Sequence, residues 1–278
     1  MSSGHDTGGK DFDPRPLFRS IERDRRKTEP HSDDKAYQAQ QLVYEAWETS
    51  SDSREADLMK RALELNPRNV DALLYQLDGE DLALEQEIDT LRKIVAAGEQ
   101  DLGEYFKSLT GLFWAAVETR PYMRARQRLA QALESAERMD EAIGEYEAML
   151  VLNPNDNQGV RYTLLAWYLT VGRLEPAREL FKKYDECEWN TVFAWCHVLE
   201  RFLSGDLAGA EKALAVARDQ NPYTQTYVKG HRALPREIPR SYQPGEKDEA
   251  ICFADLLRAA WVKHPAALKW LAAQKIKK

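Results

Sequence analysis

The residues of this chain that could do chemistry are few and mostly far apart. Its histidines and cysteines are His5, His31, His197, His231 and His264, with Cys187, Cys196 and Cys252. Only Cys196 and His197 are neighbours, and consecutive residues of a helix point in different directions, so we do not expect a cysteine–histidine nucleophile. The chain has no HExxH, GxxxxGK(S/T), GxSxG or CxxC motif, the short signatures of metal, phosphate, acyl-transfer and thiol chemistry. We therefore predict a protein that is not an enzyme, with no cofactor and no metal.

Acidic side chains gather in two short clusters, at 78–81 and 85–87. Carboxylates bind a divalent cation when a loop holds them in a defined geometry. The spacing here fits no such loop and is typical of a solvated helix surface. We interpret both clusters as surface charge.

Cationic and amide side chains are concentrated between residues 120 and 131. Arg124 and Arg128 are one helical turn apart, and Gln127 and Gln131 continue their face. In the repeat described below, the corresponding positions hold Tyr162, Thr163 and Ala166, then Trp195, Cys196 and Leu199. Arginine and aromatic residues commonly anchor interfaces, although scattered surface aromatics are also normal. The predicted partner-binding residues are Arg124, Gln127, Arg128, Gln131, Tyr162, Thr163 and Trp195.

A repeat of about 34 residues must position these side chains. Three Asn-Pro pairs end segments of helical period: Asn66-Pro67, Asn153-Pro154 and Asn221-Pro222. Ala142, Ala177 and Ala210 recur at steps of 35 and 33, and Gly172 and Gly205 are 33 apart. Alanine lets two helices of a hairpin approach closely, and glycine suits the left-handed turn between them. We also expect helical hairpins at 35–66 and at 69–98, the latter closed by Gly98, and a separate aromatic helix at 104–118.

This spacing resembles the tetratricopeptide repeat family, most clearly over 123–222. The resemblance implies a right-handed superhelix of helical hairpins whose first helices line a concave groove. The tryptophan common in the family's first helix is replaced by Arg126, Arg161 and Ala194, and Glu55 stands where a close-packing alanine is expected. The lysine and asparagine clamp of chaperone-binding members is absent, because those positions hold Gln127, Gln131, Tyr162 and Ala166. The resemblance therefore does not imply that ligand class.

The C-terminal segment departs from the repeat. Its Pro235, Pro239 and Pro244 exclude a helix over 229–245, and we expect that loop to lie against the array, pinned by Leu234, Ile238 and Tyr242. Two helices, about 246–263 and 265–275, should follow as a terminal cap. The segment resembles the suppression-of-tumorigenicity protein 7 family and its bacterial relatives in Asn221-Pro222, Leu234-Pro235, Glu249-Ala250-Ile251 and Ala267-Leu268. That resemblance implies an architecture and no reaction.

Bulk properties limit the remaining function classes. The net charge of −7 over 278 residues disfavours a general DNA-binding protein, which needs a cationic surplus. The first residues lack the apolar stretch of a secretory signal, and no apolar run is long enough to cross a bilayer. We expect a cytoplasmic protein with three parts: a disordered tail at 1–33, a repeat array at 34–222 and a loop with a two-helix cap at 223–278.

The sequence thus predicts an all-α superhelical solenoid that acts as a non-enzymatic adaptor. Its expected partner is a peptide or protein segment in the concave groove, without DNA binding or membrane insertion. Two alternatives stay open. One is single-stranded RNA binding through arginine and aromatic stacking, and the other is an enzyme with a site between array and cap.

Overall fold

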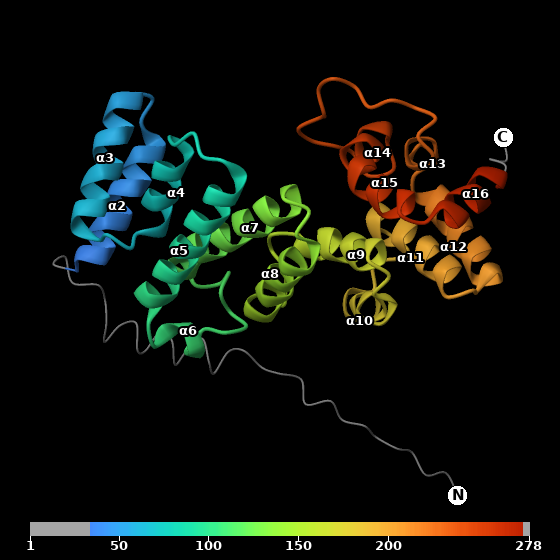
Figure 1. Ribbon diagram of the computed structural model, residues 1–278, viewed down its shortest axis with the longest axis horizontal. Helices are drawn as coiled ribbons and strands as arrows, with labels where there is room; N and C mark the ends of the chain where they lie inside the picture. Colours follow the sequence, from blue (N-terminus) through green and yellow to red (C-terminus); the bar gives the residue numbers. More distant parts are fainter. Residues whose placement is uncertain (1–33, 275–278) are drawn as a thin grey trace, which may run out of the picture. The chain divides into compact units, whose positions relative to one another are not determined.

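The computed structural model describes residues 34–274, in which helices are joined by turns and no strand occurs (Figure 1). The predicted all-α class is confirmed for this part of the chain. The predicted tail at 1–33 lies outside the described residues. The chain divides after Glu80 into two compact units, here called unit 1 (residues 34–80) and unit 2 (residues 81–274). This boundary falls inside the range expected to be one array, and we describe each unit by itself.

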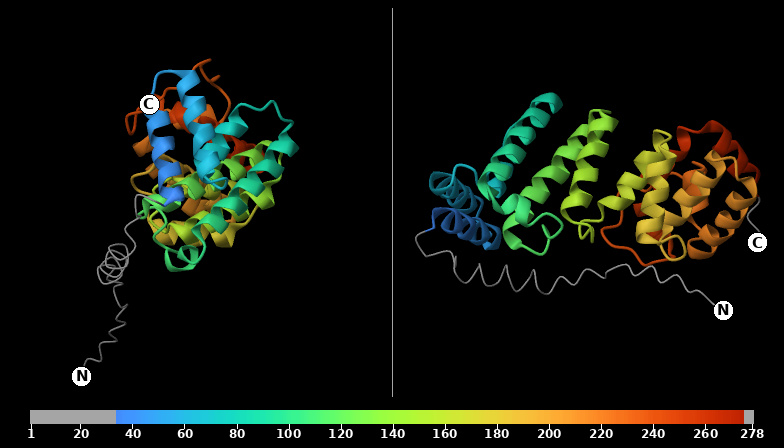
Figure 2. Two further views of the ribbon diagram at one scale, coloured as in Figure 1. Left: turned by 90° about the vertical axis from the view of Figure 1, so that its left-hand side faces the viewer. Right: turned by 90° about the horizontal axis from the view of Figure 1, so that it is seen from below.

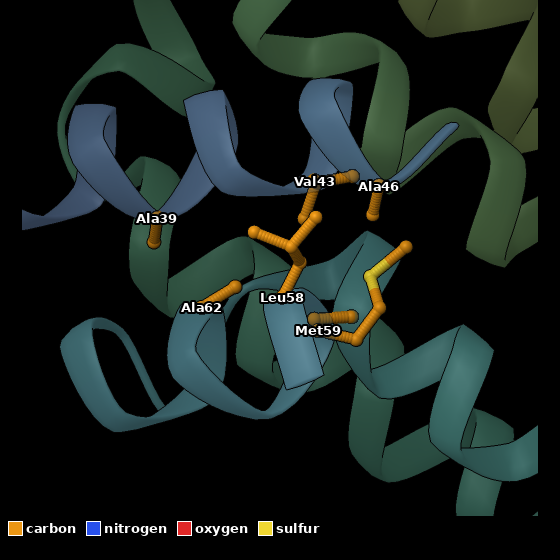
Figure 3. Packing of buried hydrophobic residues seen from close by; sticks show 7 residues of the cluster. Ala39, Val43, Ala46, Leu58, Met59 and Ala62 are labelled. Carbon is orange, nitrogen blue, oxygen red and sulfur yellow. The ribbon is translucent and has the colours of Figure 1, made fainter. Parts of the chain in front are cut away.

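Unit 1 contains α2 (Lys35–Glu48), α3 (Asp52–Leu65) and α4 (Val70–Asp78). Each helix begins after a residue whose side chain accepts a hydrogen bond from a backbone N–H of the first turn. These residues are Asp34, Ser51 and Asn69, and each satisfies one of the donors left free at a helix start. Apolar side chains of α2 and α3 pack together in the core (Figure 3), and these are Ala39, Val43, Ala46, Leu58, Met59 and Ala62.

Unit 2 begins with α5 (Leu84–Leu102), α6 (Tyr105–Ser108) and the 3₁₀ helix η1 (Val117–Thr119). Three hairpins follow: α7 (Arg120–Ser135) with α8 (Met139–Leu152), α9 (Val160–Thr170) with α10 (Leu174–Tyr184), and α11 (Thr191–Leu203) with α12 (Leu207–Gln220). Successive helices pack in chain order, and α5 packs on α7 (Figure 2).

The close-packing positions of these hairpins are where the repeat predicts them. Ala142, Ala177 and Ala210 are fully buried, which confirms the expectation that these positions are buried. Gly172 and Gly205 have φ of 75° and 81°, the left-handed region that glycine adopts without steric cost. The repeat period therefore predicts the local geometry of the hairpins correctly.

Two expectations in the first part of unit 2 are wrong. Gly98 does not end a helix, because α5 continues past it to Leu102 and Gly98 is buried. The expected helix at 104–118 is mostly irregular, with only α6 and η1 helical. The reason is a non-local anchor: the N–H groups of Gly111 and Phe113 donate to the carbonyl of Leu152 at 3.0 and 3.1 Å.

The C-terminal part of unit 2 contains α13 (Thr224–Val228), α14 (Lys247–Cys252), α15 (Ala254–Val262) and α16 (Pro265–Ala273). The single helix expected at 246–263 is therefore two helices, which meet at Phe253. The loop before α14 is non-helical, as the prolines predict. Leu234 packs on the cluster of Tyr227, Ala250, Ile251 and Ala254.

The pinning of this loop is only partly as expected. The ring of Tyr242 contacts that of Phe253 edge-on at 5.2 Å. Ile238 remains 46% exposed, much like Tyr242 at 44%, and its anchoring role stays a prediction. The contacts of Leu234 and Tyr242 hold the loop on the C-terminal helices.

Candidate interaction surface on the first helices of the hairpins

The predicted binding residues of α7 lie on one partly exposed face of that helix. Pro121 stands in the first turn, where its missing N–H costs nothing. The opposite face is buried through residues such as Leu129 and Leu133. This leaves Arg124, Gln127 and Arg128 half-buried and Gln131 exposed.

Two contacts fix the surroundings of this face. The Gln158 side-chain amide donates to Gln127 Oε1 at 2.8 Å, which places the start of the second hairpin beside the middle of α7. Arg128 forms an ion pair with Glu87 of α5 at 3.2 Å. Gln131 is the most accessible polar group of the set, with hydrogen-bonding capacity that a peptide backbone could use.

Arg126 of α7 and Arg161 of α9 each pack against an aromatic ring and an acidic side chain. Arg126 pairs with Glu145 at 3.0 Å and lies 5.5 Å from the centre of the Tyr122 ring. Burial raises the pKa of Glu145, against the opposing effect of Arg126. Burial likewise raises the pKa of Tyr122 to about 12. A guanidinium over an aromatic ring is a stable arrangement, so the half-buried Arg126 charge is both paired and packed.

The second hairpin repeats this arrangement with more partners. Arg161 pairs with Asp156 and Glu186, both at 2.9 Å. Its guanidinium lies 4.2 Å from the centre of the Tyr162 ring, and the Tyr162 hydroxyl contacts the same group. Burial is the main cause that raises the pKa of Tyr162. Tyr162 and Thr163 are half-buried, so both retain some accessible surface.

Trp195 does not belong to an accessible surface, and its predicted role as a binding anchor is corrected here. Its side chain is fully buried, and its ring lies 6.4 Å from that of Trp261 on α15. The C-terminal helix α15 packs on α9 and α11. In the same region His264, at the start of α16, contacts the Leu169 carbonyl at 2.7 Å through Nε2. The matching residues Ala166, Cys196 and Leu199 are buried as well.

A buried carboxyl group joins these C-terminal helices to the last hairpin. Glu249 Oε2 accepts hydrogen bonds from Thr191 Oγ1 at 2.9 Å, Asn221 Nδ2 at 2.9 Å and the Gly245 N–H at 2.8 Å. Sequence reasoning noted Glu249 only as part of a motif and missed this role. A signal was present, because Asn221 stands where the repeat ends and Glu249 lies in the segment that departs from it.

The remaining titratable candidates have structural partners. Cys196 is buried, and burial raises the pKa of its thiol. Burial is also the largest cause that raises the pKa of the Cys187 thiol to about 12, and the charge of Asp185 is the second. His197 accepts from Arg201 Nε at 2.9 Å, and its pKa is lowered chiefly by burial. In the acidic clusters, Glu85 pairs with Arg138 and Glu87 with Arg128.

Residues 34–274 contain no group of three or more histidine, cysteine, aspartate or glutamate side chains placed to hold a metal ion. Within the same range, every helix is too short or too polar to cross a membrane. No protein-family model and no curated protein matches the chain.

Proposed function

We propose that the protein is a non-enzymatic adaptor of tetratricopeptide type, whose hairpins form a right-handed superhelix. Its partner, a peptide or protein segment, binds on the first-helix face where that face is accessible. The residues we assign to this site are Arg124, Gln127, Arg128, Gln131, Tyr162 and Thr163. Trp195 is left out because it is buried.

The observation that carries the proposal is the Gln127–Gln158 hydrogen bond. It places the polar face of α7 beside the segment that leads into α9, where Tyr162 and Thr163 lie. A partner can therefore meet amide, cationic and aromatic groups from two consecutive hairpins. Interfaces of this kind combine aromatic or arginine anchors with a polar surrounding.

The experiment is affinity purification from native lysate with the intact chain, the Arg124→Ala/Gln131→Ala variant and a control in parallel. The control is Glu211→Ala/Lys212→Ala, two exposed positions on α12. Far-UV circular dichroism and thermal melting establish that all three proteins are folded alike. We expect at least one protein that the intact chain and the control retain and the variant loses.

Nuclease treatment separates this proposal from RNA binding. A partner retained only while RNA is intact would replace the peptide-binding proposal with the RNA-binding one. Equal recovery by all three proteins would show that recognition occurs elsewhere in the molecule.

A further inference from the structure

A second surface lies on another side of α9, between α8 and α10. A cleft of about 580 Å³ is lined there by residues of these three helices. On α9 it is formed by Leu164 and Tyr168. Leu164 comes two positions after Tyr162, and Tyr168 comes two positions after Ala166; Tyr162 and Ala166 belong to the first-helix face. Side chains two positions apart in a helix are separated by about 200° around its axis. The cleft therefore lies apart from the surface assigned above.

Part of the cleft lining is apolar. Leu150, Leu164 and Leu180 contribute to it and are each at most 7% exposed. Val151 also lines it and keeps 63% of its surface accessible. Single exposed apolar residues are ordinary on protein surfaces, but this valine adjoins a cleft with buried leucines. Covering it would remove apolar surface from water at a place already shaped to hold a side chain.

Charged side chains of both signs line the cleft. Glu147 of α8 and Glu179 of α10 line it, each in the turn before the last turn of its helix. Glu147 Oε1 accepts a hydrogen bond from the Tyr168 hydroxyl at 2.8 Å. Lys182 and Lys183 occupy the last turn of α10. The Lys183 ammonium lies 4.8 Å from the centre of the Tyr184 ring, and burial lowers its pKa. Asp156 opposes this lowering. Both lysines are exposed, and a partner carboxylate placed beside them would be attracted to both ammonium groups.

We propose that this cleft binds a segment of a partner protein that carries an apolar side chain within about one helical turn of an acidic side chain. The apolar group lies on Leu150, Leu164 and Leu180 and covers Val151. The acidic group faces Lys182 and Lys183. The volume falls within the roughly 300–1,000 Å³ of ordinary ligand pockets. This is a second binding site, independent of the first-helix face.

The test uses the full chain and a displayed library of random dodecapeptides. Selection should enrich peptides with Leu, Ile, Phe or Met within four residues of Asp or Glu. Measured by fluorescence anisotropy, an enriched peptide should bind Val151→Lys about tenfold or more weakly, as expected for loss of an anchor contact. Lys182→Glu/Lys183→Glu should weaken it by a similar factor, and high salt should weaken it partly.

Matched controls keep the test specific. Val216→Lys and Lys263→Glu/Lys269→Glu alter exposed residues outside the cleft and should bind like the native chain. A peptide in which lysine replaces the acidic residue should recover binding to Lys182→Glu/Lys183→Glu. This charge exchange distinguishes a direct contact from a general loss of structure.

Four outcomes would overturn the proposal. They are no enrichment, enrichment of peptides without the pattern, equal binding to Val151→Lys, and no recovery in the charge exchange. A concentration-dependent oligomer in analytical ultracentrifugation that Val151→Lys abolishes would assign the cleft to a second copy of this chain instead.

Discussion

The first helices of two hairpins in unit 2, α7 and α11, present the same repeat positions in opposite states. On α7 the position of Gln127 is half-buried and polar, and it contacts Gln158. On α11 the matching residue is Trp195, which is fully buried against Trp261. The hairpins themselves are alike in that the second helix of each has a fully buried alanine near its start. What differs is the cover that α15 supplies over α9 and α11.

The comparison of α7 with α11 distinguishes the orientation of a helix face from its exposure to water, which the repeat alone does not do. The period determines which side of a first helix faces away from its own hairpin. Whether that side meets water or another part of the chain depends on residues about 65 positions later, as Trp195 and Trp261 show. Accessible first-helix surface is therefore found at α7 and at the start of α9.

The largest effect should come from truncating the covered side. Trp195→Ala should reduce the free energy of unfolding of unit 2 by about 3–5 kcal/mol, because it leaves a large cavity between α11 and α15. Gln131→Ala, at the accessible side, should change it by only about 0.5 kcal/mol or less. Urea denaturation followed by circular dichroism measures both. Similar losses for the two variants would remove the distinction between the regions.

The next effect concerns the attachment of the C-terminal helices. Glu249→Ala leaves the donors of Thr191, Asn221 and Gly245 without their acceptor and should cost about 2–4 kcal/mol. Glu249→Gln keeps the shape and an acceptor oxygen, so it should cost less. Thermal and urea unfolding of the two variants supply the comparison. An equal cost for both would show that hydrogen bonding at this position matters little.

A smaller effect is expected at the hairpin between the two regions. Ala177 is fully buried on α10, a helix that packs on α9, and Ala177→Leu should destabilise by about 1–3 kcal/mol through overpacking. Differential scanning calorimetry measures the change in melting temperature. An unchanged melting curve would mean that this position has room for a larger side chain.

The smallest effect is a pH dependence at the accessible side. Burial raises the pKa of Glu134 on α7, although hydrogen bonds from Trp167 and Tyr146 oppose this. The folded state therefore holds this proton to higher pH than the unfolded chain does. Its contribution to stability is present below the ordinary pKa of 4.5 and is lost as pH rises through the raised folded value.

Glu134→Gln should remove that loss. Between about pH 4 and 7, the stability of the variant should thus rise relative to that of the native chain. Unfolding free energies across this range test the sign, with Glu211→Gln on α12 as an exposed control. A relative fall for the variant would contradict the direction assigned to the Glu134 pKa.

The predictions from sequence succeeded where structure is set by neighbouring turns and failed where distant segments meet. Ala142, Ala177, Ala210, Gly172 and Gly205 follow from the period, because each acts inside its own hairpin. The helix expected at 104–118 fails because the Leu152 carbonyl anchors an irregular segment. No local sequence pattern predicts a backbone contact between segments so far apart in the chain.

The candidate site shows the same limit. The α7 residues could be placed on one helix face from their spacing alone. The burial of Trp195 could not, because it depends on where α15 packs. Likewise the cleft between α8 and α10 combines residues of three helices, none of which forms a motif by itself.

Hydroxyl-radical footprinting with mass spectrometry tests the central claim, that the C-terminal helices cover the first-helix face at α11. Trp189, which is 65% exposed in the loop before α11, is the internal reference. In the native chain, Trp189 should be oxidised readily while Trp195 and Trp261 stay protected. In Glu249→Ala, protection of Trp195 should decrease while the protein keeps its helical circular dichroism. Oxidation of Trp195 in the native chain as fast as that of Trp189 would contradict the claim.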